Sequence, residues 1–213
     1  MSKNITIVDY GIGNLYSVMR ALEVSGSETI HISDQARDLA EAEKIILPGV
    51  GAFEDGMKGL QERGLIEPLI TAALSGKPIL GICLGMQLLV SSSEEFGLHQ
   101  GLSLIPGVVK AMPKKNTAGE NLKVPFIGWS PLSLNHDVSI RESCLANAEG
   151  KAVYLVHSFQ VIPENPTHLL ASYNFGGQQI TAAIRNGNIT GVQFHPEKSG
   201  VVGLEIIKNF IDA

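Results

Sequence analysis

Short apolar runs alternate with segments of helical periodicity through the first half of the chain, and this alternation restricts the fold more than any other feature. Unbroken apolar strands separated by helices are typical of a parallel sheet covered on both faces. We therefore expect an α/β fold with a mostly parallel, doubly wound sheet. The apolar runs are residues 5–8, 29–32, 44–47 and 78–83, and the segments with helical spacing are residues 15–22, 57–60 and 66–74.

The second half of the chain has a different pattern. Asn186-Gly187 separates two apolar runs, and this dipeptide is the strongest short signal for a β-hairpin. We expect antiparallel strands to be added to the sheet here, followed by a closing C-terminal helix. The whole chain, residues 1–213, is predicted to form one domain. The expected segments are strands at 153–162, 168–175, 180–185 and 189–194, a polar loop at 114–123 and a helix around 202–210.

Composition excludes several classes of protein. Hydrophobic residues make up 44% of the chain and charged residues 17%, which is unlike a disordered protein. A net charge of −5 does not favour nucleic acid or an anionic membrane as a partner. The longest apolar run, residues 78–90, is too short to span a bilayer, and residues 1–10 lack the apolar core of a signal peptide. The two cysteines match no disulfide framework or zinc spacing, so we expect a cytoplasmic protein without metal or cofactor.

The pentapeptide Gly81-Ile82-Cys83-Leu84-Gly85 joins a predicted strand to a helical run that extends to Val90. It has the form of a nucleophile elbow with sulfur in place of a hydroxyl. Such a turn places the nucleophile at the carboxyl end of the sheet, and a following helix N-terminus favours the thiolate. The alternative is that Cys83 is a small buried hydrophobic residue between two packing glycines.

A thiol nucleophile needs a base and a group that orients the base. His195 and Glu197 are separated by one proline, so in extended backbone their side chains share one side. The carboxylate would hold one ring nitrogen while the other faces Cys83, which makes a Cys–His–Glu triad. An isolated His-x-Glu also occurs in ordinary surface turns, where the carboxylate is solvated.

Residues 48–53, Pro-Gly-Val-Gly-Ala-Phe, follow the third predicted strand directly. Glycines there free backbone N–H groups to point into a site. We expect the N–H groups of Gly51 and Leu84 to form an oxyanion hole. A peptide flip at Gly49-Val50 or Val50-Gly51 would switch this hole on, because glycine permits backbone angles that are closed to other residues.

Four motifs in this order give the chain a family resemblance: PGVGAF, GICLGMQLL, YLVHSF and GVQFHPEKSG. Together they resemble the class I, triad-type glutamine amidotransferases over residues 5–210. With VDYGIGNL near the start, they look most similar to the glutaminase subunits of imidazole glycerol phosphate synthases. The resemblance implies a flavodoxin-like fold. It also implies that Cys83 forms a glutamyl thioester, that His195 passes a proton to the leaving ammonia, and that Glu197 orients His195.

The resemblance also implies contacts for the substrate glutamine. Gln87 and Glu95 match glutamine-binding positions, with Glu95 facing the substrate ammonium, and residues 157–159 (His157, Ser158 and Phe159) would contribute mostly backbone contacts. The alternatives are that Gln87 is an ordinary residue on a helix surface and that Glu95 belongs to a solvated pair with its neighbour.

The glutaminase motifs use the whole chain, so the resemblance implies a separate partner that consumes ammonia, a (β/α)₈-barrel cyclase of histidine biosynthesis. Asn14, Trp129 and Lys198 match interface positions, although Trp129 would alternatively be a core residue. Residues 125–130 read Pro-Phe-Ile-Gly-Trp-Ser where that family more usually has His-Met-Gly-Trp-Asn. This departure leaves open a paralogue that supplies ammonia to a sugar-modifying amidotransferase of surface polysaccharide synthesis.

Two other classes of protein fit the sequence less well. Thiol-based stress proteins of the DJ-1 type carry an elbow cysteine on a parallel sheet, but they typically have a histidine directly after it, where this chain has Leu84. A non-catalytic interaction subunit is disfavoured by the presence of Cys83, His195 and Glu197 together.

Overall fold

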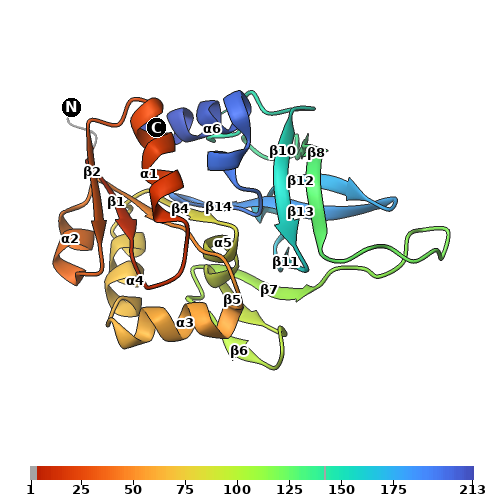
Figure 1. Cartoon of the computed structure of the whole chain (residues 1–213), viewed down its shortest axis with the longest axis horizontal. Helices are drawn as coiled ribbons and strands as arrows, with labels where there is room; N and C mark the ends of the chain where they lie inside the picture. Colours follow the sequence, from red (N-terminus) through yellow and green to blue (C-terminus); the bar gives the residue numbers. More distant parts are fainter. Residues whose placement is uncertain (1–3, 142) are drawn as a thin grey trace.

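The chain folds around a central sheet that takes strands from both halves of the sequence (Figure 1). The computed structural model describes residues 4–141 and 143–213. Within these residues the central sheet has eight strands, in the order β2-β1-β3-β4-β14-β13-β12-β9. Their bounds are β1 Asn4–Val8, β2 Thr29–Ser33, β3 Lys44–Leu47, β4 Ile79–Ile82, β9 Ser133–Leu134, β12 Leu169–Phe175, β13 Gln178–Asn186 and β14 Ile189–Val192.

The first five strands in this order pair in parallel, from β2 across to β14. The remaining strands pair antiparallel. Asn186 is the last residue of β13 and pairs with Ile189, so the turn between β13 and β14 is Gly187-Asn188, one residue later than predicted. The sheet is thus mostly parallel with antiparallel strands added from the C-terminal half, and this part of the prediction is confirmed.

Helices cover both faces of the central sheet. The helices α1 (Leu15–Val24) and α6 (Gly200–Asp212) contribute buried side chains to one hydrophobic core, together with strands β12 and β13. The helices α2 (Ala36–Glu41), α3 (Phe53–Glu62), α4 (Ile66–Leu74) and α5 (Leu84–Leu88) belong to a second core on the opposite face. Figure 1 shows α1 and α6 above the sheet and α3 and α4 below it. None of the helices in the described part of the chain is long and apolar enough to span a membrane.

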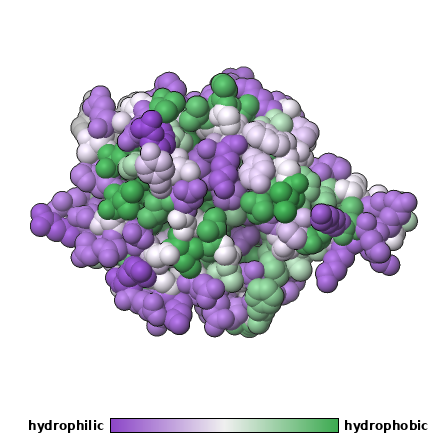
Figure 2. Space-filling model, in the orientation of Figure 1, coloured by the Kyte–Doolittle hydropathy of each residue, from purple (hydrophilic) through white to green (hydrophobic). Residues whose placement is uncertain are grey.

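Two smaller sheets flank the central one. One has four strands in the order β11-β7-β5-β6, and the other pairs β10 with β8. Their bounds are β5 Val90–Ser93, β6 His99–Gln100, β7 Ile105–Ala111, β8 Phe126–Pro131, β10 Ala152–His157 and β11 Phe159–Pro163. The polar loop predicted at 114–123 projects at the right-hand end of Figure 1, and that end is mostly hydrophilic in Figure 2.

Two predicted elements are wrong in their boundaries. The predicted helix beyond the elbow ends at Leu88, and Val90 begins β5, because periodicity does not separate a buried helix from a buried strand in an unbroken apolar run. The predicted strand at 153–162 is two strands in different sheets, β10 and β11, with Ser158 between them. Their partners β8 and β7 decide this break, and no local glycine or proline signals it.

Candidate active site

Cys83 stands at a strained turn between β4 and α5. Its backbone has φ 54° and ψ −109°, a combination that costs free energy for a residue with a side chain. Its N–H donates to the Val192 carbonyl at 2.8 Å, so the turn is joined to the end of the neighbouring strand β14. The thiol is therefore fixed at the carboxyl ends of β4 and β14, where doubly wound sheets place their sites.

The two glycines of the elbow are required by close packing. A Cβ on Gly85 would lie 1.8 Å from the Leu47 carbonyl oxygen, and one on Gly81 would lie 2.8 Å from the Gly85 backbone. Because no larger residue fits at either position, the sequence Gly-x-Cys-x-Gly lets the helix begin directly under the sheet. The glycines thus allow the turn that exposes the sulfur to the cavity.

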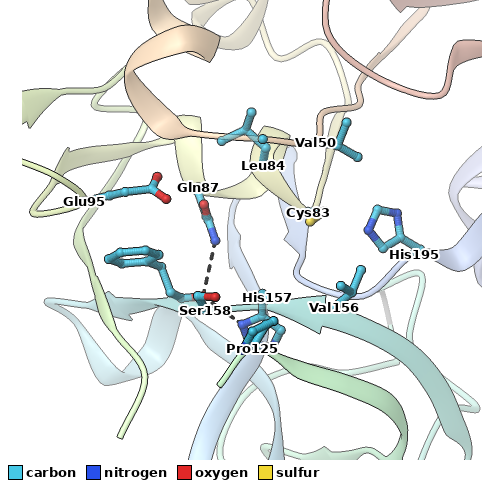
Figure 3. Close-up of a pocket in the computed structure, with 12 residues that line it drawn as sticks. Val50, Cys83, Leu84, Gln87, Glu95, Pro125, Val156, His157, Ser158 and His195 are labelled. Carbon is cyan, nitrogen blue, oxygen red and sulfur yellow. Dashed lines mark hydrogen bonds between the residues drawn. The ribbon is translucent and has the colours of Figure 1, made fainter. Parts of the chain in front are cut away.

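His195 and Glu197 are brought together by a short 3-10 turn, η2 (Pro196–Lys198). His195 is extended, with φ −99° and ψ 95°, but Glu197 lies within the turn and not in the extended backbone predicted for it. The ring nitrogen Nδ1 of His195 is 2.8 Å from Oε1 of Glu197, and both side chains are buried. In Figure 3 the imidazole points toward Cys83.

The protonation of His195 depends on these two neighbours. Burial disfavours the charged ring, but the Cys83 sulfur and the Glu197 carboxylate favour it, and the net effect raises the pKa of His195 to about 9. An imidazole with this pKa is protonated at neutral pH. The imidazole of His195 therefore holds a proton that it can deliver to a leaving group beside the sulfur.

A cavity of about 280 Å³ opens in front of the sulfur. Its wall combines the elbow, the segment after β3, the segment between β10 and β11, and the loop after β5 (Figure 3). The lining residues are Val50, Gly51, Cys83, Leu84, Gln87, Glu95, Pro125, Val156, His157, Ser158, Phe159 and His195. The structure thus places every residue predicted to bind or transform substrate at this cavity, except Glu197, which lies behind His195.

Gln87 and Glu95 are both buried, unlike a residue on a helix surface or a solvated pair. The Gln87 amide donates to the Phe159 carbonyl at 3.3 Å, and the Glu95 carboxylate accepts the Phe53 N–H at 2.7 Å, at the start of α3. Burial raises the pKa of Glu95, and the Phe53 N–H opposes this effect. A bound ammonium group would favour the charged carboxylate in the same way.

The segment between β10 and β11 is held by its own polar groups. The His157 ring meets the Phe159 carbonyl through Nδ1 at 2.7 Å and the Tyr173 hydroxyl through Nε2 at 2.8 Å. Burial lowers the pKa of His157 to about 4, so the ring is neutral. Since a carbonyl only accepts, Nδ1 carries the proton and Nε2 accepts from Tyr173. The Ser158 carbonyl accepts the Met112 N–H at 2.9 Å.

The segment that was predicted to supply the oxyanion hole lines the same cavity as the sulfur, and one of its carbonyls meets the Leu84 N–H. The Leu84 N–H donates to the Gly49 carbonyl oxygen at 3.4 Å. Gly51 has φ 102°, and the space around its missing side chain is open. The Leu84 N–H is therefore occupied by the chain's own backbone in this structure.

Comparison with known proteins identifies the family. The model of the glutamine amidotransferase class-I family matches residues 6–213. The chain belongs to this family. It is 47% identical over 210 residues to the imidazole glycerol phosphate synthase subunit HisH 1 of Legionella pneumophila (strain Paris), and the match covers 98% of each chain. It is also 47% identical over 208 residues to the HisH subunit of Geobacter sulfurreducens, and this match covers 97% of each chain.

Solved structures agree with this amidotransferase fold. PurLQS from Thermotoga maritima matches with a TM-score of 0.69 at 23% identity, covering 100% of this chain and 97% of that one. The glutaminase domain of Trypanosoma brucei CTPS matches with a TM-score of 0.65 at 18% identity, covering 98% and 90%. At these identities the likeness shows the fold alone, and it confirms the fold class that the resemblance implied.

The three residues predicted to lie at a partner interface are exposed and lie on neighbouring elements. Asn14 caps α1 by accepting the Ser17 N–H at 3.2 Å, and Lys198 lies in η2, which packs against both α1 and β10. Trp129 on β8 is 55% exposed and meets Tyr154 of β10 edge to face. The tryptophan is thus a surface residue in this structure, not a core residue.

Two residues of this amidotransferase site were missed by sequence reasoning. Val50 shares a peptide bond with the Gly49 carbonyl that meets Leu84. Its N–H points the opposite way, so it would take the place of that carbonyl if the peptide turned over. Gln193 is fully buried beside the sulfur, at the end of β14. Its signal was visible, because Gln193 is an amide side chain inside the apolar run 189–194. In the described part of the chain, no three His, Cys, Asp or Glu side chains are placed to hold a metal ion.

Proposed function

We propose that this chain is a glutaminase subunit that hydrolyses glutamine and passes ammonia to a partner synthase. The observation that supports this proposal most strongly is the strained elbow cysteine, which shares a cavity with a buried His–Glu pair. Cys83 is the nucleophile, His195 is the acid and base, and Glu197 orients the imidazole.

The first step transfers the acyl group to sulfur. The Cys83 thiolate attacks the side-chain carbonyl carbon of glutamine and forms a tetrahedral intermediate. The C–N bond then breaks as the imidazolium of His195 gives its proton to the departing nitrogen, which leaves as ammonia. The product is a glutamyl thioester on Cys83, with neutral His195 held by Glu197.

The second step releases glutamate. Neutral His195 takes a proton from water, and the hydroxide attacks the thioester carbon. The C–S bond breaks, the thiolate of Cys83 and the imidazolium of His195 are restored, and glutamate departs. Glu197 keeps Nδ1 protonated through both steps, because its carboxylate accepts from that nitrogen at 2.8 Å.

The oxyanion hole is completed by a backbone rotation. Turning the Gly49–Val50 peptide removes the Gly49 oxygen from the Leu84 N–H and presents the Val50 N–H in its place. The geometry supports Val50 as the second donor ahead of Gly51, which belongs to the next peptide. A donor aimed at the oxyanion contributes about 3 kcal/mol to the transition state.

Substrate glutamine lies along the cavity from Glu95 to Cys83. Glu95 binds its ammonium group, Gln87 contacts the substrate near the reacting amide, and His157, Ser158 and Phe159 form the opposite wall. The substrate roles of these residues are supported by their place in the cavity and by the motifs that they share with the family.

The partner is a (β/α)₈-barrel cyclase of histidine biosynthesis in the cytoplasm. It uses the ammonia and a phosphoribosyl aminoimidazole carboxamide substrate to make imidazole glycerol phosphate and an aminoimidazole carboxamide ribotide. The names of the relatives at 47% identity favour this partner over a sugar-modifying amidotransferase. Asn14, Trp129 and Lys198 form the docking surface beside the turn that carries Glu197.

Glutamate release tests the proposal. It is measured with this chain alone and then with a cognate cyclase subunit and its nucleotide ligand. We expect strong stimulation by the cyclase, loss of activity in Cys83→Ala, and stoichiometric labelling of Cys83 by a glutamine-mimicking diazoketone in the activated complex. Absence of both labelling and stimulation would remove the glutaminase proposal, whereas labelling without binding to the cyclase would redirect the search to sugar-amidating partners.

A further inference from the structure

We propose that Gln193 is a positioning residue that sets the state of the nucleophile, and this inference rests on the glutaminase function proposed above. Its side-chain amide is fully buried at the end of β14, beside the end of β4 that carries Cys83. Its Nε2 donates to the Cys83 sulfur at 3.7 Å. Its Oε1 accepts from the Gln87 amide at 3.1 Å.

The direction of this amide is fixed by the groups around it. The Phe159 carbonyl only accepts, so the nitrogen end of the Gln87 amide must face it, at 3.3 Å. The second N–H of the same nitrogen then faces Gln193, so the side-chain oxygen of Gln193 must be the acceptor. The N–H end of Gln193 is therefore turned toward the sulfur of Cys83.

The neutral ring of His157 supports the start of this chain of hydrogen bonds. Its Nδ1–H donates to the same Phe159 carbonyl at 2.7 Å, while the Tyr173 hydroxyl donates to Nε2 at 2.8 Å. The carbonyl that orients Gln87 is thus held in place from a second side. The network runs without a break from Tyr173 to the sulfur, through groups that are buried or nearly so.

An N–H aimed at sulfur favours the thiolate over the thiol, because a hydrogen bond to a charged acceptor is stronger than one to a neutral acceptor. Gln193 therefore has two effects. It stabilises the attacking form of Cys83, and it joins the nucleophile to Gln87 in the substrate cavity. Its polar atoms are satisfied within this network, as buried polar groups require.

The test is the pH dependence of Cys83 alkylation by iodoacetamide in the isolated chain, followed by mass spectrometry of the Cys83 peptide. We compare the native chain with Gln193→Met, which keeps length and burial but removes the donor, and with Gln179→Met at an exposed position of β13. We expect the alkylation midpoint of Gln193→Met to rise by about one pH unit, which is about tenfold slower labelling at neutral pH. Gln179→Met should match the native chain.

A purely structural role for Gln193 would lower the thermal midpoint of Gln193→Met and leave the alkylation midpoint in place, and that result overturns the proposal. If the methionine variant does not fold, the test is instead an NMR titration with pH of the native chain labelled with ¹⁵N-glutamine. The side-chain N–H resonances of Gln193 should shift as Cys83 ionises, and they should stay constant with pH in Cys83→Ala. Constant resonances in both proteins overturn the proposal.

The same experiment separates this inference from the glutaminase proposal. Alkylation needs neither glutamine nor a partner. If Cys83 is reactive but its alkylation midpoint is the same in Gln193→Met as in the native chain, only the role of Gln193 is rejected. A native Cys83 that resists alkylation at every pH counts against the nucleophile itself, and so against both proposals.

Discussion

The Leu84 N–H is paired with the Gly49 carbonyl at 3.4 Å, so one donor expected for an oxyanion hole is blocked by the chain itself. A carbonyl oxygen at that place would repel a developing oxyanion. We therefore expect the isolated chain to have weak glutaminase activity. We also expect activation to need a rotation of the Gly49–Val50 peptide.

Replacing Val50 by proline tests which N–H completes the hole. Proline has no N–H, so we expect Val50→Pro to lower kcat of the activated complex by about 10²–10³-fold, the effect of losing one oxyanion donor. Val50 is 42% exposed, and the matched control Val50→Ala keeps the N–H. Steady-state glutaminase assays measure both variants. Full activity in Val50→Pro would return the role to the Gly51 N–H.

The pKa of His195, about 9, predicts an alkaline limit to activity. The imidazolium must give its proton to ammonia, so we expect kcat/KM to fall as the pH rises through about 9. Glu197→Gln should move this midpoint downward, because it removes one of the groups that raise the pKa of His195. Initial rates of glutamate release across the pH range measure both midpoints. An unchanged midpoint in Glu197→Gln would contradict the assignment.

The same proton affects stability. The pKa of His195 is raised in the folded chain, so its protonation contributes stability that is fully present below the ordinary value of 6.5 and is lost as the pH rises through about 9. Thermal midpoints measured on both sides of this window should fall toward alkaline pH. They should fall less in His195→Gln, which does not titrate.

His157 has the opposite pH dependence. Its pKa is lowered from 6.5 to about 4 in the folded chain, so its contribution to stability is present above 6.5 and is lost as the pH falls through about 4. The difference between the unfolded and folded pKa values of His157 corresponds to roughly 3 kcal/mol of unfolding free energy. We expect His157→Gln to have a flatter dependence of stability on pH in this window. Denaturant titrations at several pH values measure it, and an equally steep slope in the variant would exclude His157 as the source.

Much of the fold could be predicted because local patterns and tertiary packing agree. The alternation of apolar runs and helical segments predicted the parallel strands, and Asn186-Gly187 predicted the hairpin of β13 and β14. The smaller sheets were missed where local pattern is ambiguous. Residues 84–93 are almost continuously buried, so the change from helix to strand at Val90 leaves no mark on their periodicity.

The site could be predicted where chemistry requires particular residue types close together in sequence. The elbow glycines and the His-Pro-Glu turn are of this kind. The orientation of the Gly49–Val50 peptide could not be predicted, because one hydrogen bond between Leu84 and Gly49 decides it and glycine permits either orientation. Gln193 was missed for a related reason, since its partners Gln87 and Cys83 lie 106 and 110 residues away.

Trp129 gives the sharpest test of the docking surface. It is 55% exposed, and Ile127, also on β8, is 60% exposed. Both present apolar area on β8, which pairs with β10, the strand that contacts the turn carrying Glu197. Buried tryptophans at interface centres commonly contribute 2 kcal/mol or more to binding. We expect Trp129→Ala to weaken cyclase binding by about 30-fold or more, and to reduce stimulation at fixed partner concentration, while the thermal midpoint of the isolated chain changes little.

Leu74→Ala is the matched control for this variant. Leu74 is 80% exposed at the end of α4, among elements of the opposite core, so its truncation removes a comparable exposed apolar group elsewhere. Calorimetric titration of the cyclase into each variant measures the affinities. Equal affinities of Trp129→Ala, Leu74→Ala and the native chain would show that the cyclase docks on another surface, and the departure at residues 125–130 would then mark a changed interface.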